Sequence, residues 1–142
     1  MTALAHSKFR AHADAEVDEL AAKIAGLLSK ARLPLDTEQA LQLEIGRLLD
    51  ANHIPHVREA KVAGGRIDFM AGYASRLAPH APSVGIECKI AGGARMIFRQ
   101  CNAYCGDPRI GHLILATGKG MLLPNRMQNV PITVVSLGSA WL

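Results

Sequence analysis

The chain has 142 residues, of which 49% are hydrophobic and 20% charged, a composition that excludes a disordered chain and suits one folded domain over residues 1–142. The net charge of +4 and the pI of about 9.2 suit a polyanionic partner without requiring one. The three cysteines form no C-x-x-C pair, and no apolar run resembles a signal peptide or a membrane span. We therefore expect a reduced, cytoplasmic protein with no membrane partner.

The first predicted element is an amphipathic helix. Residues 1–13 form a lead-in without a regular pattern, apolar residues recur at helical spacing from Asp14 onward, and Pro34 ends the pattern. Residues 1–35 are therefore expected to form an N-terminal helical extension. Its apolar face is predicted to cover the core of its own domain, and a homodimer surface is the alternative.

A second helix is predicted over residues 37–51, with Asp36 as its N-cap. Glu44 lies three residues after one leucine of the apolar stripe and four before another, so it falls on or beside the buried face. One interpretation is a carboxylate that reaches water or pairs with Arg47 or Arg58. The other is an acid that faces a functional site.

Three strands are predicted next, over residues 56–62, 66–70 and 84–90. Residues 63–65, Ala-Gly-Gly, are typical of the tight turn of a hairpin between the first two strands. The polar, proline-containing segment 71–83 then separates the second strand from the third. We expect this segment to be a surface loop that can touch a substrate.

Charged residues cluster on the second and third of these strands. Side chains alternate along a strand, so Glu87 and Lys89 share one face and Cys88 faces the other. If the two strands pair as an antiparallel hairpin, Asp68 lies beside Glu87. Two adjoining carboxylates are unfavourable without a cation between them, and Mg²⁺ binds one or two carboxylates while keeping several waters. The pattern predicts a divalent metal site, and a surface salt bridge is the alternative.

The last third of the chain completes an α/β pattern. A helix is predicted over residues 94–105, on which Gln100 borders the buried face, either supporting a site or bonding to the neighbouring backbone. The continuous apolar run 111–116 is typical of a central strand that is buried on both faces. A short irregular or helical piece is expected over residues 121–128, followed by a strand over residues 132–137.

The arrangement of Asp68 followed by Glu87-Cys88-Lys89 resembles the PD-(D/E)XK nuclease superfamily. Ile67 stands where the motif has proline, a position that varies widely in the family. The predicted order of helix, three strands, helix and strand matches the α-β-β-β-α-β core of that family. The resemblance therefore implies a restriction-endonuclease-like α/β fold, with a central mixed sheet flanked by helices and an extra N-terminal helix.

The resemblance also implies the residues of an active site. The metal, Mg²⁺ or Mn²⁺, is expected to be held by Asp68, Glu87 and the backbone carbonyl of Cys88, with Glu44 in the outer shell. Lys89 is expected to orient the attacking water and to offset charge on the phosphate. The expected catalytic residues are Glu44, Asp68, Glu87, Lys89 and Gln100.

These expectations describe a Mg²⁺-dependent endonuclease that hydrolyses DNA with little sequence specificity. An aromatic content of 4% argues against a platform on which single-stranded bases stack, and so favours duplex or branched DNA. The alternative is a non-catalytic nucleic-acid-binding or assembly module of the same fold; the complete set of acids and lysine favours the enzyme. The candidate phosphate contacts are Arg66, Gly92, Gly93, Arg95, Arg99 and Lys119.

Overall fold

The computed structural model of the chain describes residues 3–72 and 82–141, with the side chains of residues 3–13, 139 and 140 left out. The centre of the predicted surface loop, residues 73–81, and its suggested contact with substrate therefore lie outside the described residues. The predicted acids Asp68 and Glu87 and the predicted lysine Lys89 all lie inside them.

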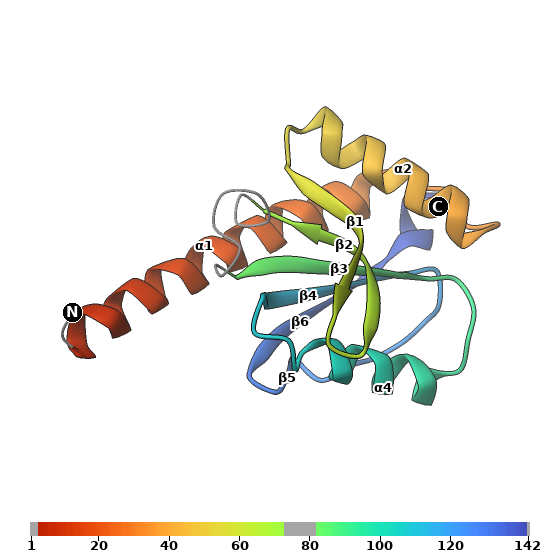
Figure 1. Cartoon of the computed structure of the whole chain (residues 1–142). Helices are drawn as coiled ribbons and strands as arrows, with labels where there is room; N and C mark the ends of the chain where they lie inside the picture. Colours follow the sequence, from red (N-terminus) through yellow and green to blue (C-terminus); the bar gives the residue numbers. More distant parts are fainter. Residues whose placement is uncertain (1–2, 73–81, 142) are drawn as a thin grey trace.

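A mixed sheet of six strands forms the centre of the fold, in the order β1-β2-β3-β4-β6-β5 (Figure 1). The first three strands pair antiparallel, and they are β1 (His56–Val62), β2 (Gly65–Ala71) and β3 (Ser83–Lys89). Parallel pairing then joins β3 to β4 (Ile110–Thr117) and β4 to β6 (Val130–Ser136). The α/β class and the mixed sheet are thus as predicted.

Helices cover both faces of this sheet. Figure 1 shows α1 (Ala3–Lys30) and α2 (Glu38–Ala51) on one face and α4 (Ala94–Tyr104) on the other. A short 3₁₀ helix, η1 (Leu137–Trp141), follows the last long strand. No helix in the described part of the chain is long and apolar enough to cross a membrane.

The start of the first helix differs from the prediction. It begins at Ala3, not at Asp14, and its N-terminal part extends beyond the sheet (Figure 1). The prediction relied on apolar periodicity, which residues 3–13 lack; they are rich in alanine and other good helix formers and contain neither glycine nor proline. The helix also ends at Lys30, four residues before Pro34.

Two other boundaries are corrections as well. Thr37, not Asp36, caps α2, because its hydroxyl accepts a hydrogen bond from the backbone N–H of Ala40 at 3.1 Å. The segment expected to be irregular or helical over residues 121–128 is irregular over residues 121–125 and contains no helix; it continues as the strand β5 (Arg126–Met127), which pairs with β6. The next two residues, 128 and 129, have φ values of 49° and 65°, as the tight turn of such a hairpin requires.

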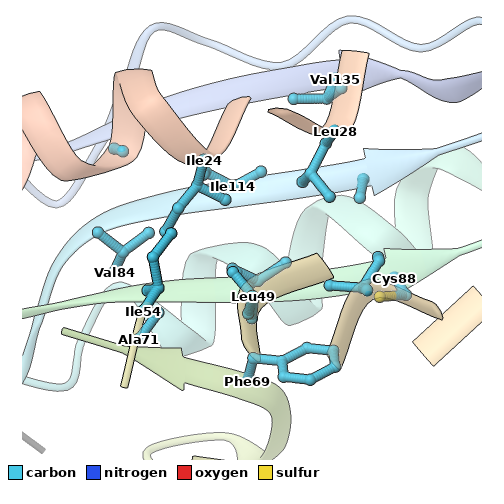
Figure 2. Packing of buried hydrophobic residues seen from close by; sticks show 14 of the residues in the cluster. Ile24, Leu28, Leu49, Ile54, Phe69, Ala71, Val84, Cys88, Ile114 and Val135 are labelled. Atoms are coloured by element: carbon cyan, nitrogen blue, oxygen red, sulfur yellow. The ribbon is translucent and has the colours of Figure 1, made fainter. Parts of the chain in front are cut away.

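Buried apolar residues form one cluster on each face of the sheet. In the first, α1 and α2 pack on the sheet through residues such as Ile24, Leu49 and Phe69 (Figure 2). In the second, α4 packs on the other face through Ile97 and Tyr104. Residues 113–116 of β4 alternate between the two clusters, so the prediction of a strand buried on both faces is confirmed. The prediction that the first helix covers the core of its own domain is also confirmed.

A polar clamp joins α1 to the sheet within the first of these layers. The buried His112 of β4 lies with Nδ1 at 2.8 Å from Asp18 of α1 and with Nε2 at 2.8 Å from the hydroxyl of Thr133 on β6. Both ring nitrogens therefore have partners, as a buried imidazole requires. The clamp fixes the position of α1 across two parallel strands.

A second polar contact holds the β1–β2 hairpin against the end of α4. The carboxylate of the buried Asp107 accepts hydrogen bonds from the backbone N–H of Ala63 and from the guanidinium of Arg109, which in turn donates to the carbonyl of Lys61. The Arg109 hydrogen bond holds the pKa of the Asp107 carboxyl well below its usual range. The hairpin that carries Asp68 is thereby anchored at its turn.

Candidate functional site

The ladder between β2 and β3 opens where the predicted acids stand. Its last backbone pair on this side is Phe69 with Ile86, so Asp68 and Glu87 come next in register. At this point the side-chain carboxylates, instead of backbone carbonyls, accept hydrogen bonds from the backbone N–H groups of the neighbouring strand. Oε1 of Glu87 accepts from the backbone N–H of Asp68 at 3.3 Å, and Oδ2 of Asp68 accepts from the backbone N–H of Cys88 at 2.7 Å. The structure thus brings the two acids together between the strands.

A local distortion of β2 accounts for this opening. Ile67 belongs to the cluster beneath α4, whereas Phe69 belongs to the cluster beneath α1 and α2. Residues two apart in a regular strand share a face, so β2 changes faces at Asp68. On its other side, the ladder to β1 skips Glu59, which has a φ of 50°. Asp68 therefore lies at an irregularity in both of its ladders.

The electrostatics of the acid pair favour the protonated form of Glu87. Glu87 is 2% exposed, and burial together with the negative charge of Asp68 raises the pKa of its carboxyl to about 8, although the charge of Lys89 acts in the opposite direction. Nζ of Lys89 lies 3.6 Å from Oε2 of Glu87. Near pH 7, Glu87 therefore keeps a proton unless a further positive charge replaces it.

The donor set fits a hard divalent cation. Asp68 and Glu87 provide adjoining carboxylate oxygens. The backbone N–H of Cys88 points toward β2, and the N–H and carbonyl of one strand residue point to the same side, so the carbonyl of Cys88 also faces β2. Within the described residues, no group of three or more His, Cys, Asp or Glu side chains lies close enough together to hold a metal ion. Two carboxylates with a carbonyl would suit Mg²⁺ or Mn²⁺, which keep several waters, better than zinc.

Two residues of α4 complete the surroundings of Glu87. The hydroxyl of the fully buried Tyr104 lies 3.1 Å from Oε2 of Glu87 and 2.8 Å from the carbonyl oxygen of Arg66, and it accepts a hydrogen bond from Nε2 of Gln100 at 2.7 Å. Burial and the charge of Glu87 raise the pKa of the Tyr104 phenol above its usual value, so it remains a donor. Gln100 therefore reaches the acid pair through Tyr104.

The site residues expected from the sequence did not include Tyr104. The available signal was its spacing of four residues from Gln100, which puts the two side chains on one helix face.

On the opposite side of the pair, α2 contributes a different residue from the one expected. Nε2 of Gln42 donates to Oδ1 of Asp68 at 3.0 Å. Glu44 forms an ion pair with Arg47 on the same helix, which is the alternative that the sequence left open. Gln42 and Glu44 are two residues apart and so project roughly 200° apart around the helix. The α2 side chain that contacts Asp68 is therefore an amide, and not the carboxylate of Glu44.

An acid of α2 does lie near the end of β3, one turn before Gln42. Oε1 of Glu38 accepts a hydrogen bond from the backbone N–H of Ile90 at 3.2 Å. Burial raises the pKa of the Cys88 thiol well above its usual value, and the neighbouring charges of Asp68, Glu87 and Glu38 add to this effect. Sequence reasoning missed Glu38 because the apolar stripe of α2 does not include it.

The predicted phosphate contacts fall into two groups. Lys119 and Gly92 meet where β3 and β4 end, because Nζ of Lys119 donates to the carbonyl of Gly92 at 2.6 Å, and Gly92 has a φ of 110° that favours glycine. Gly93 follows as the N-cap of α4. The other candidates, Arg66, Arg95 and Arg99, have exposed side chains, and none of the described contacts joins these side chains to the acid pair.

Comparisons of the chain with family models, with curated proteins and with solved structures found no match.

Proposed function

We propose that this protein is a Mg²⁺- or Mn²⁺-dependent endonuclease that hydrolyses DNA phosphodiester bonds. One observation carries the proposal: Asp68 and Glu87 adjoin between two opened strands, with the amine of Lys89 at 3.6 Å from Glu87. A buried pair of carboxylates is unfavourable by itself, and a divalent cation relieves its repulsion. A divalent cation beside a positively charged side chain is one arrangement that catalyses phosphodiester hydrolysis.

In this mechanism, Asp68, Glu87 and the carbonyl of Cys88 would hold a divalent ion, which would supply Lewis acidity for the hydrolysis. Glu87 would have to release its proton to solvent in order to bind the ion. The hydroxyl of Tyr104 then donates to Glu87 and fixes the orientation of that carboxylate. The ammonium group of Lys89 stabilises the negative charge that gathers on the phosphate oxygens in the transition state.

The order and direction of the strands support a restriction-endonuclease-like fold for this proposal. Asp68 and Glu87 lie on antiparallel neighbours, β2 and β3, and a parallel connection through α4 follows from β3 to β4. This is the arrangement that the resemblance to the PD-(D/E)XK superfamily implies. The N-terminal helix α1 is then an addition that packs on the same sheet.

The proposed substrate is duplex or branched DNA, cleaved with little sequence specificity. The net charge of +4 favours a polyanion, and a chain with three phenylalanines, two tyrosines and one tryptophan offers few side chains on which bases can stack. A cytoplasmic location remains a prediction from the sequence, and a homodimer remains the alternative that the sequence left open.

A cleavage assay tests the proposal. Labelled single-stranded, duplex, flapped and four-way DNA is incubated with Mg²⁺, Mn²⁺ or EDTA and with wild type, Asp68→Asn, Lys89→Ala or the control Lys61→Ala. Lys61 is an exposed residue of β1, so its substitution removes a positive charge away from the acid pair. We expect metal-dependent cleavage that falls by about a hundredfold or more in Asp68→Asn and Lys89→Ala and persists in Lys61→Ala.

A binding measurement separates the enzyme from the non-catalytic module. Mn²⁺ should raise the melting temperature of wild type but not of Asp68→Asn, because a ligand stabilises only the form that binds it. DNA binding without cleavage and without this metal effect would favour the non-catalytic module over the nuclease.

A further inference from the structure

A guanidinium group lies close to the acid pair without belonging to it. Arg58 is exposed on β1, and its Cζ atom lies 5.5 Å from the centroid of the Phe69 ring. Its Nη2 atom donates to Oε1 of Gln42 at 3.1 Å, and the other end of the same amide donates to Asp68 at 3.0 Å. One side chain thus joins Arg58 to the carboxylate proposed to hold the metal.

The two contacts fix the guanidinium but leave most of its hydrogen-bonding capacity free. Phe69 is fully buried, so its ring is a rigid support, and a guanidinium stacks on an aromatic ring without using its N–H donors. Gln42 accepts from Nη2 alone, whereas a guanidinium has five N–H donors. The remaining donors can therefore reach a ligand.

Arg58 also differs from neighbouring arginines in its charge partners. Arg47 pairs with Glu44 and Arg109 pairs with Asp107, but no ion pair found among the described residues includes Arg58. A fixed cation that is not neutralised by a carboxylate is preorganised to receive an anion.

We propose that Arg58 binds a backbone phosphate of the nucleic acid next to the phosphate that is cleaved, and that Gln42 sets its position relative to Asp68. This inference rests on the proposed function, because it takes the acid pair as the site of cleavage. A guanidinium binds two oxygens of a phosphate at once, whereas the ammonium of a lysine acts as a point charge.

The test measures binding to a fluorescent DNA duplex over a series of salt concentrations. It compares wild type with Arg58→Ala, Arg58→Lys and the control Arg47→Ala. Ca²⁺ replaces the catalytic ion so that the DNA is not cut. Loss of one phosphate contact should weaken binding by about tenfold and lower the slope of log K against log salt by about one in Arg58→Ala. Arg58→Lys should keep the slope and lose part of the affinity. Arg47→Ala should match wild type.

A second readout distinguishes a phosphate contact from a disturbance of the acid pair. The Mn²⁺-induced rise in melting temperature should be the same in Arg58→Ala as in wild type, because Arg58 does not touch the metal ligands. If Arg58→Ala fails to fold, Arg58→Gln, a longer neutral side chain, replaces it in the salt series.

An unchanged salt slope in Arg58→Ala, or wild type that binds no duplex, overturns the proposal. Loss of the Mn²⁺ effect with an unchanged slope likewise overturns it and assigns Arg58 a structural role. If wild type binds duplex but neither cleaves it nor gains stability from Mn²⁺, the proposed nuclease function is wrong. In that case, a salt slope that falls by about one in Arg58→Ala still supports a contact between Arg58 and a phosphate.

Discussion

Asp68 and Glu87 lie opposite each other on β2 and β3, and each carboxylate accepts a backbone hydrogen bond from the other residue's strand. The acids thereby stand where ladder hydrogen bonds would otherwise join the two strands. The two backbone N–H groups have acceptors, but the two carboxyl groups are brought together where ionising both is unfavourable. The stability of the protein without metal should therefore depend on the protonation of this pair.

The first prediction concerns Glu87 and pH. In EDTA, the free energy of unfolding of wild type should fall as pH rises from about 4.5 to about 8, because native Glu87 keeps its proton up to a pKa of about 8 whereas the unfolded residue loses it near its ordinary value. Glu87→Gln cannot ionise and should lack this decline. Near pH 8 it should exceed wild type in stability by about a few kcal/mol.

Denaturant unfolding at pH 5, 6.5 and 8 measures this difference. Glu44→Gln is the matched control, since Glu44 pairs with Arg47 and lies outside the acid pair. If wild type and Glu87→Gln show the same dependence on pH, then Glu87 does not hold a proton in the folded protein.

The second prediction concerns the carboxyl of Asp107, whose pKa the Arg109 hydrogen bond lowers. The stabilisation should be complete above the unfolded pKa of about 4 and should be lost as pH falls toward the lower native value. Asp107→Asn should therefore be less stable than wild type by about 1–3 kcal/mol at pH 6, with a gap that narrows as pH falls from about 5 to about 2. Denaturant unfolding over that range checks it, with the exposed Asp50→Asn as control. A gap that stays constant with pH would contradict the prediction.

The third prediction compares two adjacent glycines of the hairpin turn. Gly64 and Gly65 both have positive φ, 83° and 139°, so alanine strains the backbone at either position. Only at Gly64 would the new methyl group meet a neighbour, the Cβ of Ala103 at 2.5 Å, whereas Gly65 has open space. In denaturant unfolding, Gly64→Ala should therefore lose about 1–3 kcal/mol through this contact in addition to the backbone strain, whereas Gly65→Ala should lose stability through strain alone. A Gly64→Ala variant as stable as wild type would show that the turn does not pack against α4.

The fourth prediction concerns the distortion opposite Asp68. Glu59 has a φ of 50°, a conformation that costs a residue with a side chain about 1–2 kcal/mol relative to glycine. Glycine itself costs about 0.5–1 kcal/mol in a strand, which offsets part of this gain. Glu59→Gly should therefore be more stable than Glu59→Ala by about 0.5–1 kcal/mol. Thermal or denaturant unfolding of the two variants decides the sign. A more stable Glu59→Ala would show that this residue is extended in solution.

Local patterns were sufficient to predict most elements of the described fold. The strand over residues 56–62 matches β1, and the alternation of Glu87, Cys88 and Lys89 along β3 follows from the period of a strand. The continuous apolar run at residues 111–116 identified the central strand, because only a strand covered on both faces tolerates it. These are properties of neighbouring residues in the chain.

Predicting the acid pair required both the local sequence pattern and the tertiary structure. The sequence placed Asp68 and Glu87 on two strands, and only the register of those strands decides that they stand opposite each other. The change of face at Asp68 was not predictable, since it arises from the packing of Ile67 and Phe69 into different clusters.

The helix side chains around the pair were decided by the tertiary structure alone. An apolar stripe identifies which face of α2 is buried, but it does not say which flanking polar residue meets β2, and the answer is Gln42, not Glu44. The same holds for Tyr104, whose ring reads as core in the sequence while its hydroxyl reaches Glu87 from α4. Sequence periodicity determined which elements form, whereas the contacts between side chains on different elements depend on the angle and distance at which those elements pack.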